Sequence, residues 1–184
     1  MTCEFTIRLA LREDASAVAD IYGLYVRESA ATFELEAPSL AETERRIVAT
    51  LQAYPCLVAE NAEGKVLGFC YAHALREREA YIRSAETTIY LAPEACGSGM
   101  AAALYSQLEM LLSRQGITNL YACITDSNLA SMRFHEKCGF SKVAHFTNCG
   151  YKFNQWWGIT WWEKIIASHD NPPQPFVIFP LLES

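Results

Sequence analysis

The sequence of 184 residues has no apolar run approaching the roughly 20 residues that a membrane-spanning helix needs, so we expect no membrane span. Its first residues, Met1-Thr2-Cys3-Glu4-Phe5, lack the basic and apolar regions of a secretory signal, which favours a cytoplasmic location. Positive charge is also scarce, because the net charge is −6 and the pI is near 5.2. These absences argue against membranes and nucleic acids as partners, although a basic patch around Arg76, Arg78 and Arg83 could bind a small anion.

The seven cysteines include no Cys-x-x-Cys pair and no histidine at ligand spacing, so we expect neither a metal site nor a disulfide framework. Cys56, Cys70 and Cys123 fall in predicted strands, where a reduced thiol packs as a small apolar residue. The length and the 51% hydrophobic content are those of one globular domain with a sizeable core.

The most informative segment is a glycine-rich turn between an apolar strand and a long helix. Gly97 and Gly99 have no side chain, so their amides can approach an anion, and the helix that starts there adds the positive end of its dipole. No Gly-Lys-Ser/Thr follows, which excludes a Walker loop. The segment therefore predicts a cradle for a pyrophosphate.

Two other interpretations of this turn remain open. Residues 97–102 also fit the loose dinucleotide fingerprint, with Asp126 roughly 20 residues or more downstream as a ribose-binding acid. That fingerprint normally opens the first βα unit of a sheet, whereas most of this chain precedes the glycines. The other alternative is an ordinary strand-to-helix turn that uses glycine only for its geometry.

The order of the expected elements is a mixture of strands and helices. Strands are expected at Phe5–Leu9, Cys56–Glu60, Val66–Ala74, Ala85–Leu91, Asn119–Ile124, Val143–Phe146 and Trp156–Ile166. Helices are expected after Asp14, from a capping box at Ser39–Glu42 to about Ala53, at Gly99–Gln115 and at Asn128–Cys138. Asp170–Pro175 is a proline-containing linker, and we expect the apolar segment Phe176–Leu182 after it to dock.

The strand, the Gly-x-Gly cradle, the helix and the later segments Asn128–Ser131 and Phe134–Phe140 together resemble the GNAT acetyltransferase superfamily. The resemblance implies an α/β fold of the GNAT-like acyl-CoA N-acyltransferase type, with a central mixed, mostly antiparallel sheet flanked by helices. The domain would occupy residues 1–167, with the linker and apolar tail at 168–184.

Three further segments are similar to one branch of that superfamily, the phosphinothricin and methionine sulfone or sulfoximine N-acetyltransferases. They are Tyr54–Glu60, Glu86–Leu91 and Gly150-Tyr151-Lys152-Phe153 with Trp156. The branch implies direct transfer of acetyl from acetyl-CoA to the primary amine of a small amino-acid-like acceptor, without a metal, by a protein that is commonly a homodimer.

The resemblance implies a cofactor-binding set. The pyrophosphate of acetyl-CoA would bind the amides of Gly97, Ser98, Gly99, Met100, Ala101 and Ala102, and the pantetheine arm would pair with the strand edge at Ile89, Tyr90 and Leu91. Asn128 would bind pantetheine or cap the following helix, or do both. Cys96 departs from the family's usual Gln before the cradle, which implies weaker cofactor binding at most, since the other donors are main-chain groups.

The resemblance also implies two catalytic residues. Glu86 would remove a proton from the acceptor amine, which is protonated near neutral pH; the alternative is an exposed carboxylate at a strand end. His135 stands where the branch has a histidine, and it would protonate the departing thiolate or accept a proton from the amine. Direct transfer is also favoured because Cys96, the cysteine expected nearest the site, has no evident base.

For the acceptor, Arg76, Glu77 and Arg78 match a substrate-contacting segment of the branch, and arginine suits a bidentate pair with a carboxylate or phosphinate. The same residues could instead form a solvated loop of alternating charge. Thr87, Thr88, Phe33 and Tyr81 complete the expected acceptor site. Two other functions stay open: acetylation of another amine, such as a polyamine, an aminoglycoside or a protein N-terminus, and a non-catalytic acyl-CoA sensor.

Overall fold

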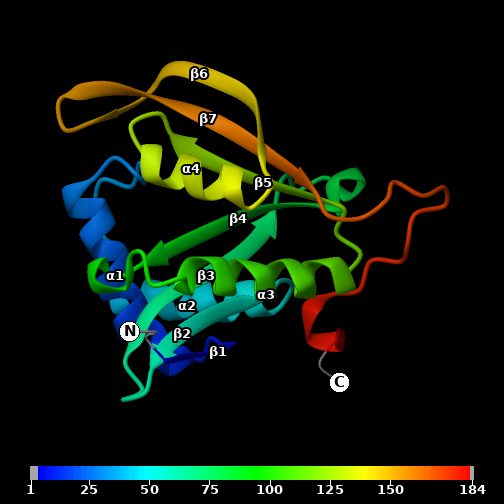
Figure 1. The fold of residues 1–184 in the computed structure, drawn as a ribbon, viewed down its shortest axis with the longest axis horizontal. Helices are drawn as coiled ribbons and strands as arrows, with labels where there is room; N and C mark the ends of the chain where they lie inside the picture. Colours follow the sequence, from blue (N-terminus) through cyan, green and yellow to red (C-terminus); the bar gives the residue numbers. More distant parts are fainter. Residues whose placement is uncertain (1–3, 183–184) are drawn as a thin grey trace.

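The computed structural model describes residues 4–182, which form one seven-stranded mixed sheet with helices on both faces (Figure 1). The strands are β1 (Phe5–Leu9), β2 (Cys56–Asn61), β3 (Val66–Ala74), β4 (Ser84–Leu91), β5 (Asn119–Thr125), β6 (Ser141–Lys152) and β7 (Gln155–Ile165). Their order is β1-β2-β3-β4-β5-β7-β6, and every neighbouring pair is antiparallel except β4 and β5. The expected mixed, mostly antiparallel sheet is confirmed.

The four α-helices are α1 (Ala15–Glu28), α2 (Leu40–Leu51), α3 (Met100–Arg114) and α4 (Leu129–Lys137). Side chains along β2 alternate between the two faces of the sheet. Cys56 and Val58 pack in a cluster with α1 and α2, whereas Leu57 and Ala59 pack in the core beneath α3, so the helices cover opposite faces. Central strands covered on both faces read as continuous apolar runs. The helices therefore form two layers with the sheet between them.

Two helix starts differ from the expectation. Asp14 precedes α1, but its carboxylate accepts from the Leu11 amide at 2.7 Å and from the Arg8 guanidinium at 2.7 and 2.8 Å, so it closes a preceding turn and not α1. Ser39 does cap α2, accepting from the Glu42 amide at 3.2 Å. The Glu42 carboxylate binds arginines, so only half of the expected capping box is present.

The strand expected at Val143–Phe146 is wrong in length, since β6 runs over Ser141–Lys152. Most of its side chains are exposed, and the ladder with β7 has irregularities between Lys142 and Ala144 and between Phe146 and Gly150. Pairing with the aromatic strand β7, and not an alternating pattern of its own, keeps β6 extended. Figure 1 shows this long hairpin (yellow to orange) at one edge of the molecule.

The apolar tail docks on the domain, and its contacts lie at the C-terminal end of α3, a location that the sequence did not predict. The Val177 amide donates to the Gln115 carbonyl at 2.9 Å, the Phe179 amide donates to the Ala53 carbonyl at 3.3 Å, and the Phe179 ring is buried in the core. Within residues 4–182, no helix combines the length and the apolarity needed to cross a bilayer.

The feature that positions the site is the parting of β4 from β5. The two strands pair in parallel only from Ser84 opposite Asn119 to Glu86 opposite Tyr121. Beyond Glu86, the part of the chain that the structure describes gives β4 no ladder partner on this side, although β3 still pairs with it on the other. The strands therefore diverge, and the space between them is left to helix ends and to a cleft.

Candidate active site

A cleft of about 370 Å³ fills the space between the parting strands. Its walls come from residues 87–91 of β4, residues 122–124 of β5, the start of α3 with the turn before it, and α4 as far as His135, and Tyr25 and Ala31 also line it. Nine of the expected site residues line it: Thr87, Thr88, Ile89, Tyr90, Leu91, Gly97, Ala101, Asn128 and His135. The sequence reasoning thus brought together residues that are separated by nearly fifty positions.

At one end of the cleft, the glycine turn is built as an open cradle. Gly97 and Gly99 have φ values of +81° and +89°, a region that side chains other than glycine rarely adopt. A Cβ added to either glycine would meet no heavy atom within 4 Å, so the surface above them is free. The first amides of α3 have no acceptor inside the helix, and this end carries the positive pole of its dipole. The turn can therefore receive an anion.

The other expected cradle residues divide between the turn and the core. The Ser98 hydroxyl accepts from the Met100 amide at 3.2 Å and donates to the Ala95 carbonyl at 2.7 Å, so it is engaged inside the turn. The Met100 side chain is buried in the core, and Ala102 lies on another face of α3. The Ser98 amide donates to the Ala95 carbonyl at 3.3 Å, so neither this amide nor that of Met100 is free, and an anion would be left to the other main-chain amides of the turn.

Along the open edge of β4, successive residues point their main-chain N–H and C=O groups alternately toward β3 and toward the cleft, which decides which of them a bound ligand can reach. The Ala92 amide donates to the Leu67 carbonyl of β3, and main-chain direction reverses with each residue of an antiparallel pair. Ile89 and Leu91 therefore direct their main-chain groups to the cleft, while those of Tyr90 face β3. The Tyr25 hydroxyl already occupies the Leu91 carbonyl at 2.7 Å, so Ile89 is the open position.

Glu86 lies where β4 and β5 part, on the face of the sheet that also carries α1 and α2. Its carboxylate is 4.0 Å from the Nε2 atom of His73, its cross-strand neighbour, and its side chain is 20% exposed. Burial raises the pKa of Glu86, while His73 and Arg76 oppose the shift. The sequence reasoning missed His73, because it did not predict that the strand at 66–74 pairs with the strand at 85–91, the pairing that sets His73 opposite Glu86.

His135 is buried at the inner end of the cleft among the rings of Tyr105, Phe134 and Phe140, at centroid distances of 5.5, 5.2 and 5.2 Å. Its Nδ1 atom is 2.9 Å from the Ser131 carbonyl, which assigns the ring proton to Nδ1 and leaves Nε2 as an acceptor. Burial lowers the pKa of His135. The ring is therefore neutral near pH 7 and is a weak base.

Asn128 has the capping role, since its Oδ1 accepts from the Ser131 amide at 3.1 Å at the start of α4. It also lines the cleft, so its proposed contact with a bound cofactor is compatible with the cap. The aromatic residue that sequence reasoning missed is Tyr105 of α3, whose hydroxyl bonds the Thr87 hydroxyl. No motif signalled it, because it lies in an ordinary apolar stripe of α3.

The expected acceptor residues lie in two separate places. Arg76, Glu77, Arg78 and Tyr81 are exposed in the segment after β3, and only Arg76 has a resolved electrostatic effect on Glu86. Phe33 belongs to the segment between α1 and α2, and a side chain at Gly150 of β6 would collide with its ring. The structure therefore does not gather these five residues around one point.

The cysteines need one correction. Cys56 and Cys70 are buried as expected, but Cys123 is exposed and lines the cleft, as Cys96 does. The negative charge of Glu86 acts on the Cys123 thiol, so Cys123 as well as Cys96 lies near the site. Although the Cys123 side chain is exposed, the surrounding chain still desolvates its thiolate, and this effect, with Glu86 and Cys149 nearby, raises the pKa of Cys123 to about 12. Cys123 is therefore a protonated and poorly nucleophilic thiol at neutral pH.

No group of three or more His, Cys, Asp or Glu side chains within residues 4–182 is arranged to hold a metal ion.

Comparison with known proteins agrees with this geometry. The acetyltransferase (GNAT) domain family matches residues 7–161. The phosphinothricin N-acetyltransferase of Streptomyces coelicolor is 35% identical over 167 residues, which cover 89% of this chain and 97% of that protein. The L-methionine sulfoximine/L-methionine sulfone acetyltransferase of Salmonella typhimurium is 29% identical over 171 residues, which cover 91% of this chain and 98% of that protein.

Among solved structures, a GNAT superfamily phosphinothricin acetyltransferase from Sinorhizobium meliloti, in complex with AcCoA, superposes with a TM-score of 0.88. The two chains are 31% identical, and the match covers 98% of this chain and 97% of the other.

The burial of His135 predicts a pH dependence of stability. Because its pKa is lowered in the folded state, the unfolded chain binds more protons below pH 6.5, so this contribution to the free energy of unfolding is present above pH 6.5 and is lost as the pH falls. Urea unfolding between about pH 7.5 and about pH 5.5 should show a smaller loss of stability for His135→Phe than for the wild type. Equal losses in the two proteins would contradict the assignment.

Proposed function

Because the chain belongs to the GNAT acetyltransferase family, we propose that it transfers the acetyl group of acetyl-CoA to the primary amine of a small amino-acid-like acceptor. The observation that carries the proposal is the cleft between β4 and β5, which has an anion cradle at one end and a carboxylate of raised pKa near the other. Relatives that are named for phosphinothricin and for methionine sulfoximine or sulfone support an acceptor of that type.

The residues fit acetyl-CoA, which supplies the thioester that the amine attacks. Gly97 and the first amides of α3 would hold its pyrophosphate, and the free main-chain groups of Ile89 would pair with its pantetheine arm. Asn128 would contact the same arm while capping α4. Because these donors are mostly main-chain groups, the presence of Cys96 in place of the family's usual glutamine leaves the cradle functional.

We assign the base to Glu86 and not to His135. Burial moves the pKa of Glu86 upward, toward the working pH, and moves that of His135 downward, away from it. The amine nitrogen forms a bond to the thioester carbon, its proton passes to Glu86 directly or through a water, and the carbon–sulfur bond breaks to release CoA as a thiolate that takes a proton from solvent. Transfer is direct, since Cys123 is held as a neutral thiol.

We also propose that the active protein is a cytoplasmic homodimer, with residues 1–167 as its catalytic domain. The six described cysteines are free, which supports a reducing compartment, and cell fractionation tests this location. Six large apolar side chains of the β6–β7 hairpin are exposed, and exposed apolar surface suits a subunit interface. They are Val143, Phe146, Tyr151, Phe153, Trp156 and Ile165.

The dimer is tested by sedimentation velocity. The double variant Phe146→Ser with Trp156→Ser should sediment as a monomer at concentrations where the wild type is a dimer, because two large side chains leave the proposed interface. Met110→Ser, which removes an equally exposed apolar side chain from α3, should leave the dimer intact. A wild-type monomer, or a dimeric double variant, would refute the proposed interface.

The base is tested by Glu86→Gln, which keeps the shape and removes the charge. We expect kcat to fall by about 10²- to 10⁴-fold, the usual contribution of a general base, with the Kd for CoA unchanged. Burial raises the pKa of Glu86, so any stabilisation that this side chain contributes is present at low pH and is lost as the pH rises through that pKa. Glu86→Gln should therefore unfold no more easily than the wild type at pH 7. The control is Glu79→Gln, at an exposed position outside the cleft. Undiminished turnover in Glu86→Gln would remove Glu86 from the mechanism.

The cradle is tested by a pair of glycine variants with the same backbone strain. Gly99→Glu sets a negative side chain beside the proposed pyrophosphate and should weaken calorimetric binding of CoA by roughly tenfold or more. Gly64, in the β2–β3 turn, has a φ of +78° and equally open surroundings. Gly64→Glu should cost a similar 1–2 kcal/mol, roughly, in stability but spare CoA binding. Equal Kd values for both variants would contradict the cradle.

A further inference from the structure

The segment between α1 and α2, residues 29–38, has neither helix nor strand and passes beside the cleft. Ala31 of this segment is one of the residues that line the cleft. The hydroxyls of Thr32 and Tyr22 are hydrogen bonded at 2.7 Å, and the Tyr22 ring lies 5.1 Å from the ring of Tyr90 on β4. The segment therefore forms part of the wall of the site.

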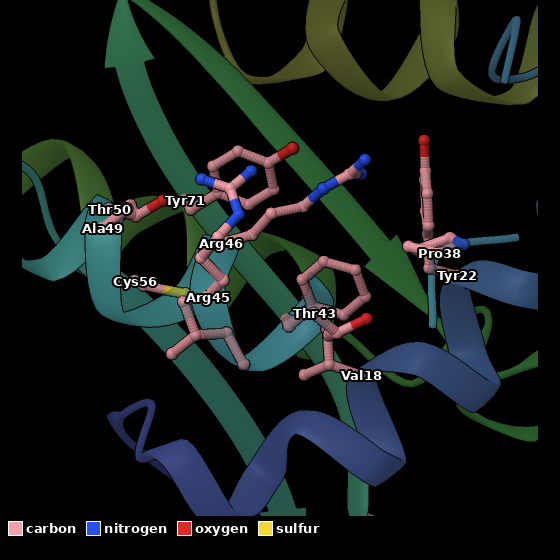
Figure 2. A pocket seen from close by; sticks show the side chains of 12 residues that line it. Val18, Tyr22, Pro38, Thr43, Arg45, Arg46, Ala49, Thr50, Cys56 and Tyr71 are labelled. Carbon is pink, nitrogen blue, oxygen red and sulfur yellow. The ribbon is translucent and has the colours of Figure 1, made fainter. Parts of the chain in front are cut away.

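Packing leaves the second half of this segment unsupported. Leu35 is 72% exposed, and Glu36 and Ala37 are exposed as well. Pro38 lines a pocket of about 390 Å³ between α2 and the sheet, so open space and not a packed core lies beside this end of the segment (Figure 2). A stretch of chain with few buried apolar contacts opens easily. The position of the segment therefore depends on its polar anchors.

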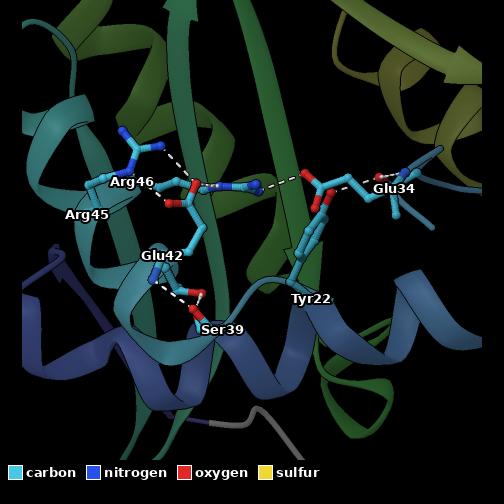
Figure 3. Close-up of polar contacts among 8 residues, drawn as sticks. Tyr22, Glu34, Ser39, Glu42, Arg45 and Arg46 are labelled. Carbon is cyan, nitrogen blue, oxygen red and sulfur yellow. Dashed lines mark hydrogen bonds and ion pairs between the residues drawn. The ribbon is translucent and has the colours of Figure 1, made fainter. Parts of the chain in front are cut away.

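The anchor on the side of α2 is open to solvent. Figure 3 shows the Arg46 guanidinium between Glu42 of α2 and Glu34 of the segment, which it bonds at 2.8 and 2.7 Å. The side chains of Arg46 and Glu34 are 43% and 35% exposed, and ion pairs that are open to water contribute little to stability. The firmer anchor lies on the opposite side, in the β6–β7 hairpin.

Lys152 of β6 makes this second anchor. The residue is 4% exposed, although most of its strand is open to solvent, and its Nζ atom donates to the Thr32 carbonyl at 2.8 Å. Burial lowers the pKa of Lys152, and Glu34 opposes the shift, so the charged form is less favoured in the folded chain than in the unfolded one. An apolar side chain would fill the same space without this cost. What the ammonium adds is a donor that is directed to one carbonyl of the segment.

Gly150, two residues before Lys152 on the same face of β6, receives the next side chain of the segment. A Cβ at Gly150 would lie 2.2, 2.5 and 2.6 Å from three atoms of the Phe33 ring. The φ angle of Gly150 is not positive, so the close approach of the ring, and not the backbone conformation, requires glycine here. Two successive residues of the segment are thus held by two residues of one strand.

We propose that Lys152 and Gly150 are positioning residues for the acetyl transfer, because they clasp residues 29–38 to the hairpin and so hold the wall against which the acceptor binds. The inference rests on the proposed function, since that function supplies the acceptor. The contacts proposed for CoA are with the glycine cradle, Ile89 and Asn128, and none of these belongs to the segment. Release of the clasp therefore affects the acceptor and spares the cofactor.

The first test compares two lysines of β6. Lys152→Met removes the buried ammonium and keeps an unbranched side chain, and Lys142→Met makes the same change at an exposed position of the strand. The acceptor is whichever of phosphinothricin, methionine sulfone and methionine sulfoximine the wild type uses best. Its KM should rise roughly tenfold or more in Lys152→Met, with kcat and the Kd for CoA unchanged, because an interaction that only holds the acceptor site is lost. Lys142→Met should match the wild type. Equal KM values in the two variants, or a loss confined to kcat, would overturn the proposal.

The second test reaches the segment from Gly150 and leaves the ammonium in place. Gly150→Ala should displace the Phe33 ring and raise the KM for the acceptor in the same way. In a Phe33→Ala background the added methyl group has no ring to displace, so Gly150→Ala should there leave the KM unchanged. An unaltered KM in Gly150→Ala alone, or an equal rise in both backgrounds, would contradict the clasp.

Hydrogen exchange separates a failure of the clasp from a failure of the proposed function, because it needs no turnover. The Ala31 and Glu34 amides donate to hydroxyls within the segment, each at 3.3 Å. Amides of residues 29–38 should exchange at least roughly tenfold faster in Lys152→Met than in Lys142→Met, while those of α3 exchange equally. Faster exchange without acetylation of any acceptor would uphold the clasp and refute only the proposed function. Equal exchange in the two variants would refute the clasp whatever the kinetics give.

Discussion

The site depends on the separation of two parallel strands that begin as neighbours. Thr87 lies at the point of divergence, where its hydroxyl bonds both the Tyr105 hydroxyl and, at 3.1 Å, the Tyr121 carbonyl. The Tyr105 ring is fully buried beneath the sheet and occupies space next to the point where β5 separates from β4. A polar main-chain edge in the middle of a sheet costs free energy unless it is paired, and the cleft leaves that edge of β4 available to a ligand.

One physical cause, removal from water, shifts the pKa of His135, which lines the cleft, and that of Glu86, which precedes the lining residue Thr87, in opposite directions. Desolvation disfavours the charged form of either group, so it strengthens the Glu86 carboxylate as a base and weakens the His135 imidazole. Hydrogen bonds and charges oppose both shifts without reversing them: the Ser131 carbonyl that accepts from Nδ1 acts to raise the pKa of His135, and His73 and Arg76 act to lower that of Glu86. The two residues look like interchangeable bases in the sequence, but their surroundings shift their pKa values in opposite directions.

Local chemistry made much of this predictable. Glycine at positive φ, the alternation of β2, and the pairing of β2 with β3 are short-range properties, and the expected elements at 56–60, 66–74 and 99–115 are found within a residue or two. The features that could not be predicted depend on contacts between residues far apart in the sequence. The length of β6 depends on its pairing with β7. The contact of Tyr105 with Thr87 depends on which strand α3 packs against. Whether the main-chain groups of Ile89 or those of Tyr90 face the cleft depends on the pairing of β4 with β3.

The acceptor side of the molecule shows why single motifs could not describe it. The segment between α1 and α2 is held from the far edge of the sheet: the Lys152 ammonium donates to the Thr32 carbonyl at 2.8 Å, and the Thr125 hydroxyl bonds the Ala30 carbonyl. The Arg46–Glu34 pair ties the same segment to α2. Side chains from three different elements, β5, β6 and α2, thus fix one stretch of chain over the face that carries Glu86. Because the proposed subunit interface lies on the hairpin that holds Lys152, association of two copies would stiffen this segment, which links the quaternary structure to the selection of the acceptor.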